Sequence, residues 1–116
     1  IERATAHLTS GLLHICVNYG ARQELVRAVN KAVALGRFVD ENSLESMFYT
    51  AGLPDPDLII RTGGEIRLSN FLLYQAAYSE LYFSGKMWPE FSKRDLEKAI
   101  ENYSARDRRY GNVREE

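Results

Sequence analysis

Cysteine and net charge are both scarce in this chain, and each shortage excludes a class of protein. Cys16 is the one cysteine among 116 residues, and no Cys or His lies near it at metal-ligand spacing. The sequence therefore offers neither an internal disulfide nor a zinc site, and we expect a reducing compartment, the cytoplasm. Fifteen basic against sixteen acidic side chains leave a formal net charge of -1. No overall field draws such a chain to nucleic acid or to an anionic membrane, so any anion binding must be local.

Long apolar runs are also missing, because Asn18, Asn30, Arg61 and Asn70 interrupt the longest ones. No stretch reaches the roughly 20 apolar residues that cross a bilayer. The chain opens on Ile-Glu-Arg, without a methionine or a signal-like leader. We therefore expect it to start inside a longer protein.

What remains is the composition of an ordinary globular domain, in which strand-like and helix-like patterns alternate. Short apolar runs predict strands at residues 12–17, 57–60 and 81–83. Apolar residues at helical spacing predict helices at 21–35, 43–49 and 71–78, and a last one after Ser92. This alternation predicts an α/β fold, a partial parallel sheet flanked by helices on both faces. No repeat or linker divides residues 1–116, so we expect them to be part of one domain.

Local signals refine these elements. Gly36 is placed to end the first helix, Asp40, Asn42 or Ser43 could cap the second, and Ser69 and Asn70 are predicted caps of the 71–78 helix. Ser92 and Asp95 have the spacing of a capping box. His14 and Cys16 lie in the first predicted strand and are expected to face the core or to be hydrogen-bonded rather than to be reactive.

The predicted sheet is too small to stand alone. Three strands leave both sheet edges open, which predicts a partner or a missing half. Residues 70–83 also carry more apolar and aromatic side chains than one short helix face and a small sheet can bury. Such a surplus predicts a homodimer interface built from this region and the last helix.

The most informative chemistry lies in residues 57–70, which read D-L-I-I-R-T-G-G-E-I-R-L-S-N. Ligands of open α/β sheets bind outside the carboxyl ends of the strands, where residues 61–64 fall. The two glycines would let backbone N–H groups approach an anion, two arginines offer forked donors, and Ser69 would begin a helix that favours negative charge. The pattern favours a phosphate or diphosphate cradle. The alternative is a surface loop in which Arg61 and Arg67 form solvated ion pairs with Glu65.

The whole stretch 57–80 closely resembles the signature of cis-prenyltransferases, the isoprenyl transferases that include undecaprenyl diphosphate synthase. Four further motifs agree in order and spacing: N-Y-G-A-R at 18–22, E-L-Y-F at 80–83, W-P-E-F at 88–91 and R-R-Y-G at 108–111. The resemblance covers nearly the full chain. It implies that residues 1–116 are the C-terminal half of a cis-prenyltransferase-like fold, with the N-terminal part of the domain absent.

The resemblance also implies a reaction, the condensation of isopentenyl diphosphate with an allylic diphosphate such as farnesyl diphosphate, which yields a polyprenyl diphosphate. It implies that Arg61, Arg67 and Ser69 hold the diphosphate of isopentenyl diphosphate. Glu80 matches a glutamate near the Mg²⁺ ion, and a carboxylate oxygen is the ligand that Mg²⁺ accepts. The lipid product would bring the enzyme into peripheral contact with a membrane.

Two further pairs of residues take their expected roles from the family. Arg109 and Gly111 match an arginine-x-glycine motif that binds substrate in the active site of the neighbouring subunit, so the resemblance implies a homodimer. Asn18 and Arg22 match a motif near the substrate, whose role stays open.

The chain departs from the family in one decisive respect. The N-terminal motif of the type H-x-x-M-D-G-N-x-R-W is absent, and its aspartate is the family's principal ligand for magnesium and diphosphate. We therefore expect the chain alone to be inactive. Ile66 also stands where some bacterial members carry histidine, and Tyr74 replaces a tryptophan.

Two other functions remain open. One is a non-catalytic partner subunit of a heteromeric cis-prenyltransferase, against which the retained Arg61, Arg67, Ser69 and Glu80 argue. The other is a generic phosphate-binding module, which would need neither a hydrophobic tunnel nor a dimer.

Overall fold

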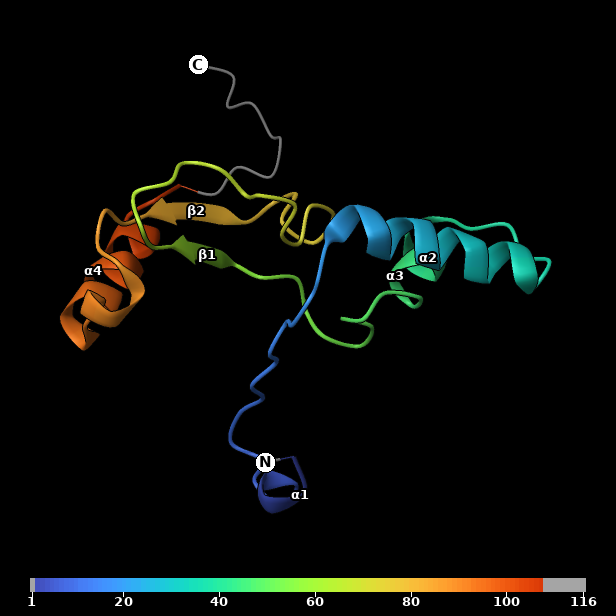
Figure 1. Cartoon of the computed structure of the whole chain (residues 1–116), viewed down its shortest axis with the longest axis horizontal. Coiled ribbons are helices and arrows are strands. Elements are labelled where there is room, and N and C mark those ends of the chain that lie inside the picture. The colour runs from blue at the N-terminus through green and yellow to red at the C-terminus, as the bar shows by residue number, and fades with distance from the viewer. Residues whose placement is uncertain (1, 108–116) are drawn as a thin grey trace.

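The computed structural model describes residues 2–107, in which three helices precede two successive strands and a 3₁₀ helix and an α-helix follow them (Figure 1). The elements are α1 (Glu2–Thr5), α2 (Ala21–Ala34), α3 (Glu41–Glu45), β1 (Leu58–Arg61), β2 (Glu80–Phe83), the 3₁₀ helix η1 (Trp88–Glu90) and α4 (Lys93–Ser104). In Figure 1, α2 and α3 form one group, and the two strands with α4 form another. The long connections before β1 and between the strands run from one group to the other. No helix among residues 2–107 is long and apolar enough to cross a bilayer.

The sheet is a parallel pair, which confirms the α/β class. Leu58 lies opposite Glu80, and Arg61 lies opposite Phe83. Every residue of the two strands is half-buried, and α4 packs against β2. The second and third predicted strands are therefore confirmed within one residue at their ends.

The helix α2 begins at the predicted residue and ends one residue before the predicted end, where the local chemistry stops it. Gly36 takes a φ of +63°, a conformation that favours glycine and ends the helix. The buried face of α2 carries Ala28 and Ala32, which pack on Met47 and Phe48 to form the small apolar core.

The helix α3 begins two residues earlier than predicted. Asp40 accepts a hydrogen bond from the Ser43 backbone N–H at 2.8 Å, and the Ser43 hydroxyl accepts one from the Asp40 N–H at 2.9 Å. This reciprocal pair is a capping box, and it selects Asp40 among the three residues that could have capped the helix.

The strand predicted at residues 12–17 is absent from the structure. Residues 8–18 run away from the rest of the chain (Figure 1), and the side chains of Leu12, Leu13, Ile15 and Val17 are between 66% and 82% exposed. A strand needs a neighbouring edge for its backbone hydrogen bonds, and no pairing partner for this segment lies among residues 2–107. The expectation that His14 and Cys16 face the core is therefore also wrong, since both are exposed.

The helix predicted at residues 71–78 is likewise absent, and a succession of turns takes its place. Ser69, Asn70 and Leu72 have φ values of +50°, +64° and +44°, which no α-helix tolerates. Neither Ser69 nor Asn70 is the cap of a following helix. The Ser69 hydroxyl instead accepts a hydrogen bond from Arg61, and the Asn70 side chain is bonded to the distant residues Arg22 and Gln23.

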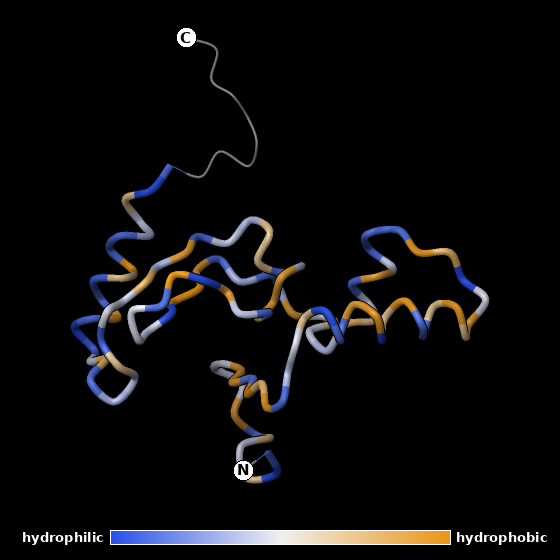
Figure 2. Tube along the Cα trace, turned by 45° about the horizontal axis from the view of Figure 1, so that its top comes forward, coloured by the Kyte–Doolittle hydropathy of each residue, from blue (hydrophilic) through white to orange (hydrophobic). Residues whose placement is uncertain are grey.

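The chain leaves far more surface exposed than a compact monomer of its length. Its accessible surface is 9653 Å², whereas a compact monomer of this size exposes about 6,500 Å². Figure 2 shows hydrophobic stretches along α2 and along the N-terminal segment. On α2, Val26, Val29 and Val33 are exposed. This surplus agrees with the expectation that the fold needs a partner or a missing half.

The turn after β1 is tied to the turn after β2. The Gly63 N–H donates to the Lys86 carbonyl at 2.7 Å, and the Gly64 N–H donates to the Ser84 carbonyl at 2.9 Å. The prediction that these two N–H groups meet an anion is therefore wrong, because both are used within the chain. The two glycines supply φ values of +91° and +76°, which the turn requires.

The turn at residues 84–86 is also fixed to α4, through Asp95. The predicted capping box of Ser92 and Asp95 is present at the start of this helix. Asp95 accepts hydrogen bonds from the Ser92 N–H and from the Lys86 ammonium, both at 2.9 Å. Bonds from Ser92 and Lys86 hold the pKa of the Asp95 carboxyl well below its usual range. The carboxylate is consequently charged at neutral pH, and it anchors both the start of α4 and the 84–86 turn.

Replacing Gly64 by alanine tests the role of this turn. Gly64→Ala should lower the free energy of unfolding by about 1 kcal/mol, because an L residue resists a positive φ. The added Cβ itself finds room, since its nearest neighbour is the Gly85 Cα at 3.9 Å. Gly85→Ala is the matched control, because Gly85 has no positive φ and a Cβ there meets nothing within 4 Å. Urea denaturation of both variants measures the difference, and equal losses would contradict a conformational role for Gly64.

Candidate functional site

The loop at residues 61–70, which follows β1, is closed by the Arg61 side chain. Its Nη1 donates to the Arg67 carbonyl and to the Ser69 hydroxyl, the latter at 2.9 Å. The structure therefore brings together the three residues predicted to bind a diphosphate. An arginine carries five N–H donors, so these two bonds do not exhaust the capacity of Arg61.

The Arg67 side chain forms an ion pair with Glu65. This contact was expected if residues 61–70 were only a surface loop. The two side chains are 63% and 43% exposed. An ion pair at this exposure contributes about 0–1 kcal/mol. An incoming anion with more than one negative charge can therefore replace Glu65 at the Arg67 guanidinium at little cost.

Asn70, the last residue of the loop, caps the helix α2. The Arg22 N–H donates to Asn70 Oδ1 at 2.9 Å, and the Ala21 N–H donates to the Asn70 carbonyl at 2.9 Å. The Asn70 amide also donates to Gln23 Oε1 at 3.0 Å. These bonds join the Asn18–Arg22 motif to the 61–70 loop.

Sequence reasoning missed this contact, although one signal was present. Gly20 is the N-cap residue of α2, and glycine has no side-chain acceptor for the first N–H groups of a helix. A long helix that starts on such a residue takes its cap from elsewhere in the chain. The sequence did not indicate that Asn70 supplies it.

A buried carboxylate, which sequence reasoning also missed, lies one turn further along α2. Glu24 is 2% exposed and accepts hydrogen bonds from the Tyr19 hydroxyl at 2.5 Å, the Tyr49 N–H at 2.7 Å and the Gln75 amide at 3.2 Å. Burial, together with the bond to Glu24, raises the pKa of the Tyr19 hydroxyl. The Gln75 amide also donates to the Thr50 hydroxyl at 3.0 Å. Glu24 therefore holds three separate segments against α2.

Glu80 lies at the opposite end of the strand pair from the 61–70 loop. It begins β2, whereas the residue of β2 opposite Arg61 is Phe83, and three residues of strand span about 10 Å. Its carboxylate accepts a hydrogen bond from the Arg106 guanidinium at 2.6 Å. Within residues 2–107, no three His, Cys, Asp or Glu side chains gather in a metal-binding cluster. Arg109 and Gly111, the other predicted substrate ligands, lie outside the described residues.

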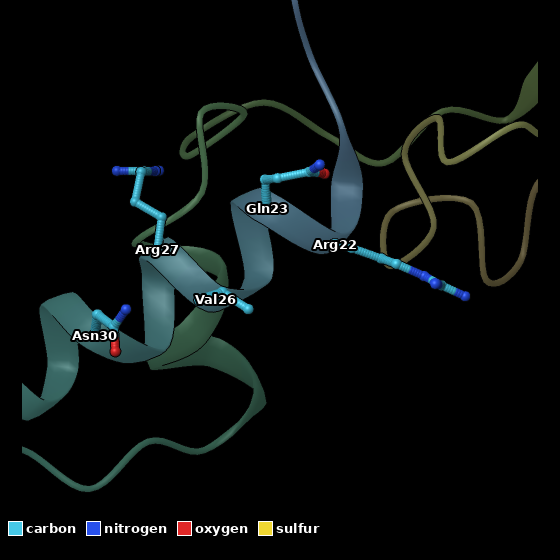
Figure 3. Close-up of a pocket in the computed structure, with 5 residues that line it drawn as sticks. All are labelled: Arg22, Gln23, Val26, Arg27 and Asn30. Atoms are coloured by element: carbon cyan, nitrogen blue, oxygen red, sulfur yellow. The ribbon is translucent and has the colours of Figure 1, made fainter.

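The hollows on the surface do not mark a second site. The larger, about 550 Å³, is lined by Arg22, Gln23, Val26, Arg27 and Asn30, all from α2. Figure 3 shows these side chains fanning out from the helix without converging on a point. The smaller, about 220 Å³, lies between α3, residues 50–55 and Gln75.

Comparison with known proteins agrees with the resemblance found in the sequence. The family model described as "Putative undecaprenyl diphosphate synthase" matches residues 1–111. An isoprenyl transferase of Thermotoga maritima is 49% identical over 118 residues, which cover 97% of this chain and 51% of that protein.

Solved structures agree as well. A probable undecaprenyl diphosphate synthase of Campylobacter jejuni matches with a TM-score of 0.82 and 34% identity, over 96% of this chain and 52% of the other. Lavandulyl diphosphate synthase of Lavandula x intermedia, in complex with dimethylallyl diphosphate, matches with a TM-score of 0.77 and 39% identity, over 83% and 44%. The chain thus spans about half the length of the relatives it matches, and it belongs to the undecaprenyl diphosphate synthase family of isoprenyl transferases.

Proposed function

We propose that this chain is the isopentenyl-diphosphate-binding part of a cis-prenyltransferase. The reaction would be the condensation of isopentenyl diphosphate with an allylic diphosphate, and the allylic substrate is not specified by this half. One observation carries the proposal: the bonds of Arg61 to Arg67 and Ser69 close a loop at the carboxyl end of β1, where parallel sheets bind ligands.

The arginines of the loop have different roles in this proposal. Arg61 holds the loop closed, while the Arg67 guanidinium and the Ser69 hydroxyl bind the substrate diphosphate by charge-assisted hydrogen bonds. The weakness of the exposed bond to Glu65 supports this exchange. Binding is then local, as the net charge of -1 requires.

Magnesium enters the proposal only through Glu80, whose carboxylate would contribute one oxygen ligand. The described residues do not by themselves fit a magnesium site, because Glu80 is paired with Arg106 and no acidic cluster surrounds it. The remaining ligands would come from outside residues 2–107. We therefore expect residues 1–116 alone to form no polyprenyl diphosphate, and we assign the metal no step in the reaction.

Replacing Arg67 by alanine tests the assignment of the loop. In the full-length enzyme, Arg67→Ala should raise the KM for isopentenyl diphosphate about tenfold to a hundredfold, the loss expected from one charge-assisted contact of about 1.5–3 kcal/mol. The KM for the allylic substrate should change much less, because the loop binds one of the two diphosphates. Steady-state kinetics with each substrate varied in turn measures both.

Arg94→Ala is the matched control, since Arg94 is an exposed arginine on α4. It should leave both KM values unchanged. Equal increases for both substrates in Arg67→Ala would mean that the loop has a structural role only. No change at all would favour the surface ion pair with Glu65.

We further propose that the full-length enzyme is a homodimer in which the C-terminal tail completes the site of the partner subunit. Apolar side chains on the 71–78 turns and on α4 are exposed, among them Phe71, Tyr78 and Ile100. The pair formed by Glu80 and Arg106 supports the shared site, because it fixes the start of the tail at the amino end of β2, away from the loop of the same chain.

Mixing two impaired variants, at an isopentenyl diphosphate concentration well below their raised KM, tests the shared site. Full-length Arg67→Ala and Arg109→Ala enzymes each lack one contribution to every active site. In a mixed dimer both lesions fall in one site and leave the other intact, so subunit exchange should restore about a quarter of the wild-type activity. Activity is measured after exchange has been verified with differently tagged subunits. Complete exchange without recovered activity would contradict the shared site, as would sedimentation of the full-length enzyme as a monomer.

A further inference from the structure

Asn70 lies where the end of the 61–70 loop meets the first turn of α2. Its carbonyl and its Oδ1 accept the N–H groups of Ala21 and Arg22, both at 2.9 Å, and its amide donates to Gln23 at 3.0 Å. Asn70 thus satisfies the first two backbone N–H groups of α2 and also holds the Gln23 side chain. The residue before it, Ser69, is held by Arg61.

The backbone of the loop is strained at this point. Ser69 and Asn70 have φ values of +50° and +64°, and two consecutive left-handed residues that are not glycine cost stability. Asparagine is among the residues that tolerate this region best. The bonds to α2 are the contacts that stabilise Asn70 in this conformation.

Gly20, the residue before α2, lies against the Asn70 side chain. It has a φ of -151°, an extended conformation that any residue adopts. A Cβ at Gly20 would lie 2.7 Å from the Asn70 amide nitrogen and would also collide with Gln23. The nearest atom is Gln23 Oε1, so a side chain at Gly20 would have to displace the bonded pair that Asn70 and Gln23 form there.

We propose that Asn70 is a positioning residue for isopentenyl diphosphate binding: by capping α2 from the end of the 61–70 loop, it holds Arg67 and Ser69 in their binding positions. This inference rests on the proposed function of the loop. Asn70 itself need not touch the substrate. Its bonds fix one end of the loop to a helix, while Arg61 fixes the loop to β1.

A pair of variants separates positioning from stability in the full-length enzyme. Asn70→Gly keeps the positive φ but removes the side-chain cap, and should raise the KM for isopentenyl diphosphate roughly fivefold to thirtyfold. Adding Gly20→Ser supplies α2 with a cap of its own, because the Gln23 side chain, no longer bonded to Asn70, is free to move aside. The double variant should recover the thermal midpoint while its KM for isopentenyl diphosphate stays raised. The kcat and the allylic KM should remain within about twofold of wild type in both.

Asp40→Gly is the matched control, because Asp40 caps α3 with the same kind of bond but does not contact the loop. It should lower the thermal midpoint without changing either KM. The inference fails if Asn70→Gly leaves the KM for isopentenyl diphosphate unchanged, if both KM values rise equally, or if the double variant restores KM together with stability.

Arg67→Ala, measured in parallel, keeps this inference separate from the proposed function. If Arg67→Ala has no effect on the KM for isopentenyl diphosphate, the function proposed for the loop is wrong. If Arg67→Ala raises that KM and Asn70→Gly does not, the loop binds the substrate but Asn70 does not position it.

Discussion

Polar contacts between residues 70–75 and the helix α2 connect the two groups of elements in this chain. Within one group α2 packs on α3, and within the other β1, β2 and α4 pack together. Asn70 caps the first turn of α2, and Gln75 bonds to the buried Glu24 one turn later. A buried carboxylate left without its donors would cost several kcal/mol. The segment between the strands is therefore held to α2 by polar contacts, which require specific geometry, as well as by apolar packing.

The same contacts explain which elements could be predicted from the sequence. α2 and α4 were predicted correctly because each has one end set locally: Gly36 ends α2, and Asp95 caps the start of α4. The helix expected at 71–78 has good helix formers, but its predicted cap Asn70 serves α2, and Gln75 is drawn to Glu24. The strand expected at 12–17 has the right composition, yet a strand also needs a pairing edge, which composition does not reveal.

In the candidate site too, the residue types could be predicted from the sequence, but the hydrogen-bond partners could not. From the residue types and the family resemblance, the sequence predicted Arg61, Arg67 and Ser69 as diphosphate ligands, and the structure brings them together in one loop. The sequence assigned an anion-binding role to the N–H groups of Gly63 and Gly64, which the structure shows bonded to the 84–86 turn. Every residue except proline has a backbone N–H group, so the sequence does not indicate which acceptor each one binds. Here the acceptors are set by a long-range contact between two turns.

If the loop binds a diphosphate as proposed, its bonds arrange the site before the ligand arrives. Arg61 and Asn70 are engaged in bonds to the chain itself, which fix the two ends of the loop. Arg67 is engaged only by an exposed carboxylate, whose attraction is screened by water. The bonds of Arg61 and Asn70 thus determine the shape of the loop. The weak pair with Glu65 keeps the Arg67 guanidinium in place but does not compete with a multiply charged ligand. In the opposite arrangement, with Arg67 buried and Arg61 unbonded, the Arg67 guanidinium would be paired too strongly to exchange Glu65 for a ligand. The loop backbone would also lack the bonds that position Arg67, so binding would cost more conformational entropy.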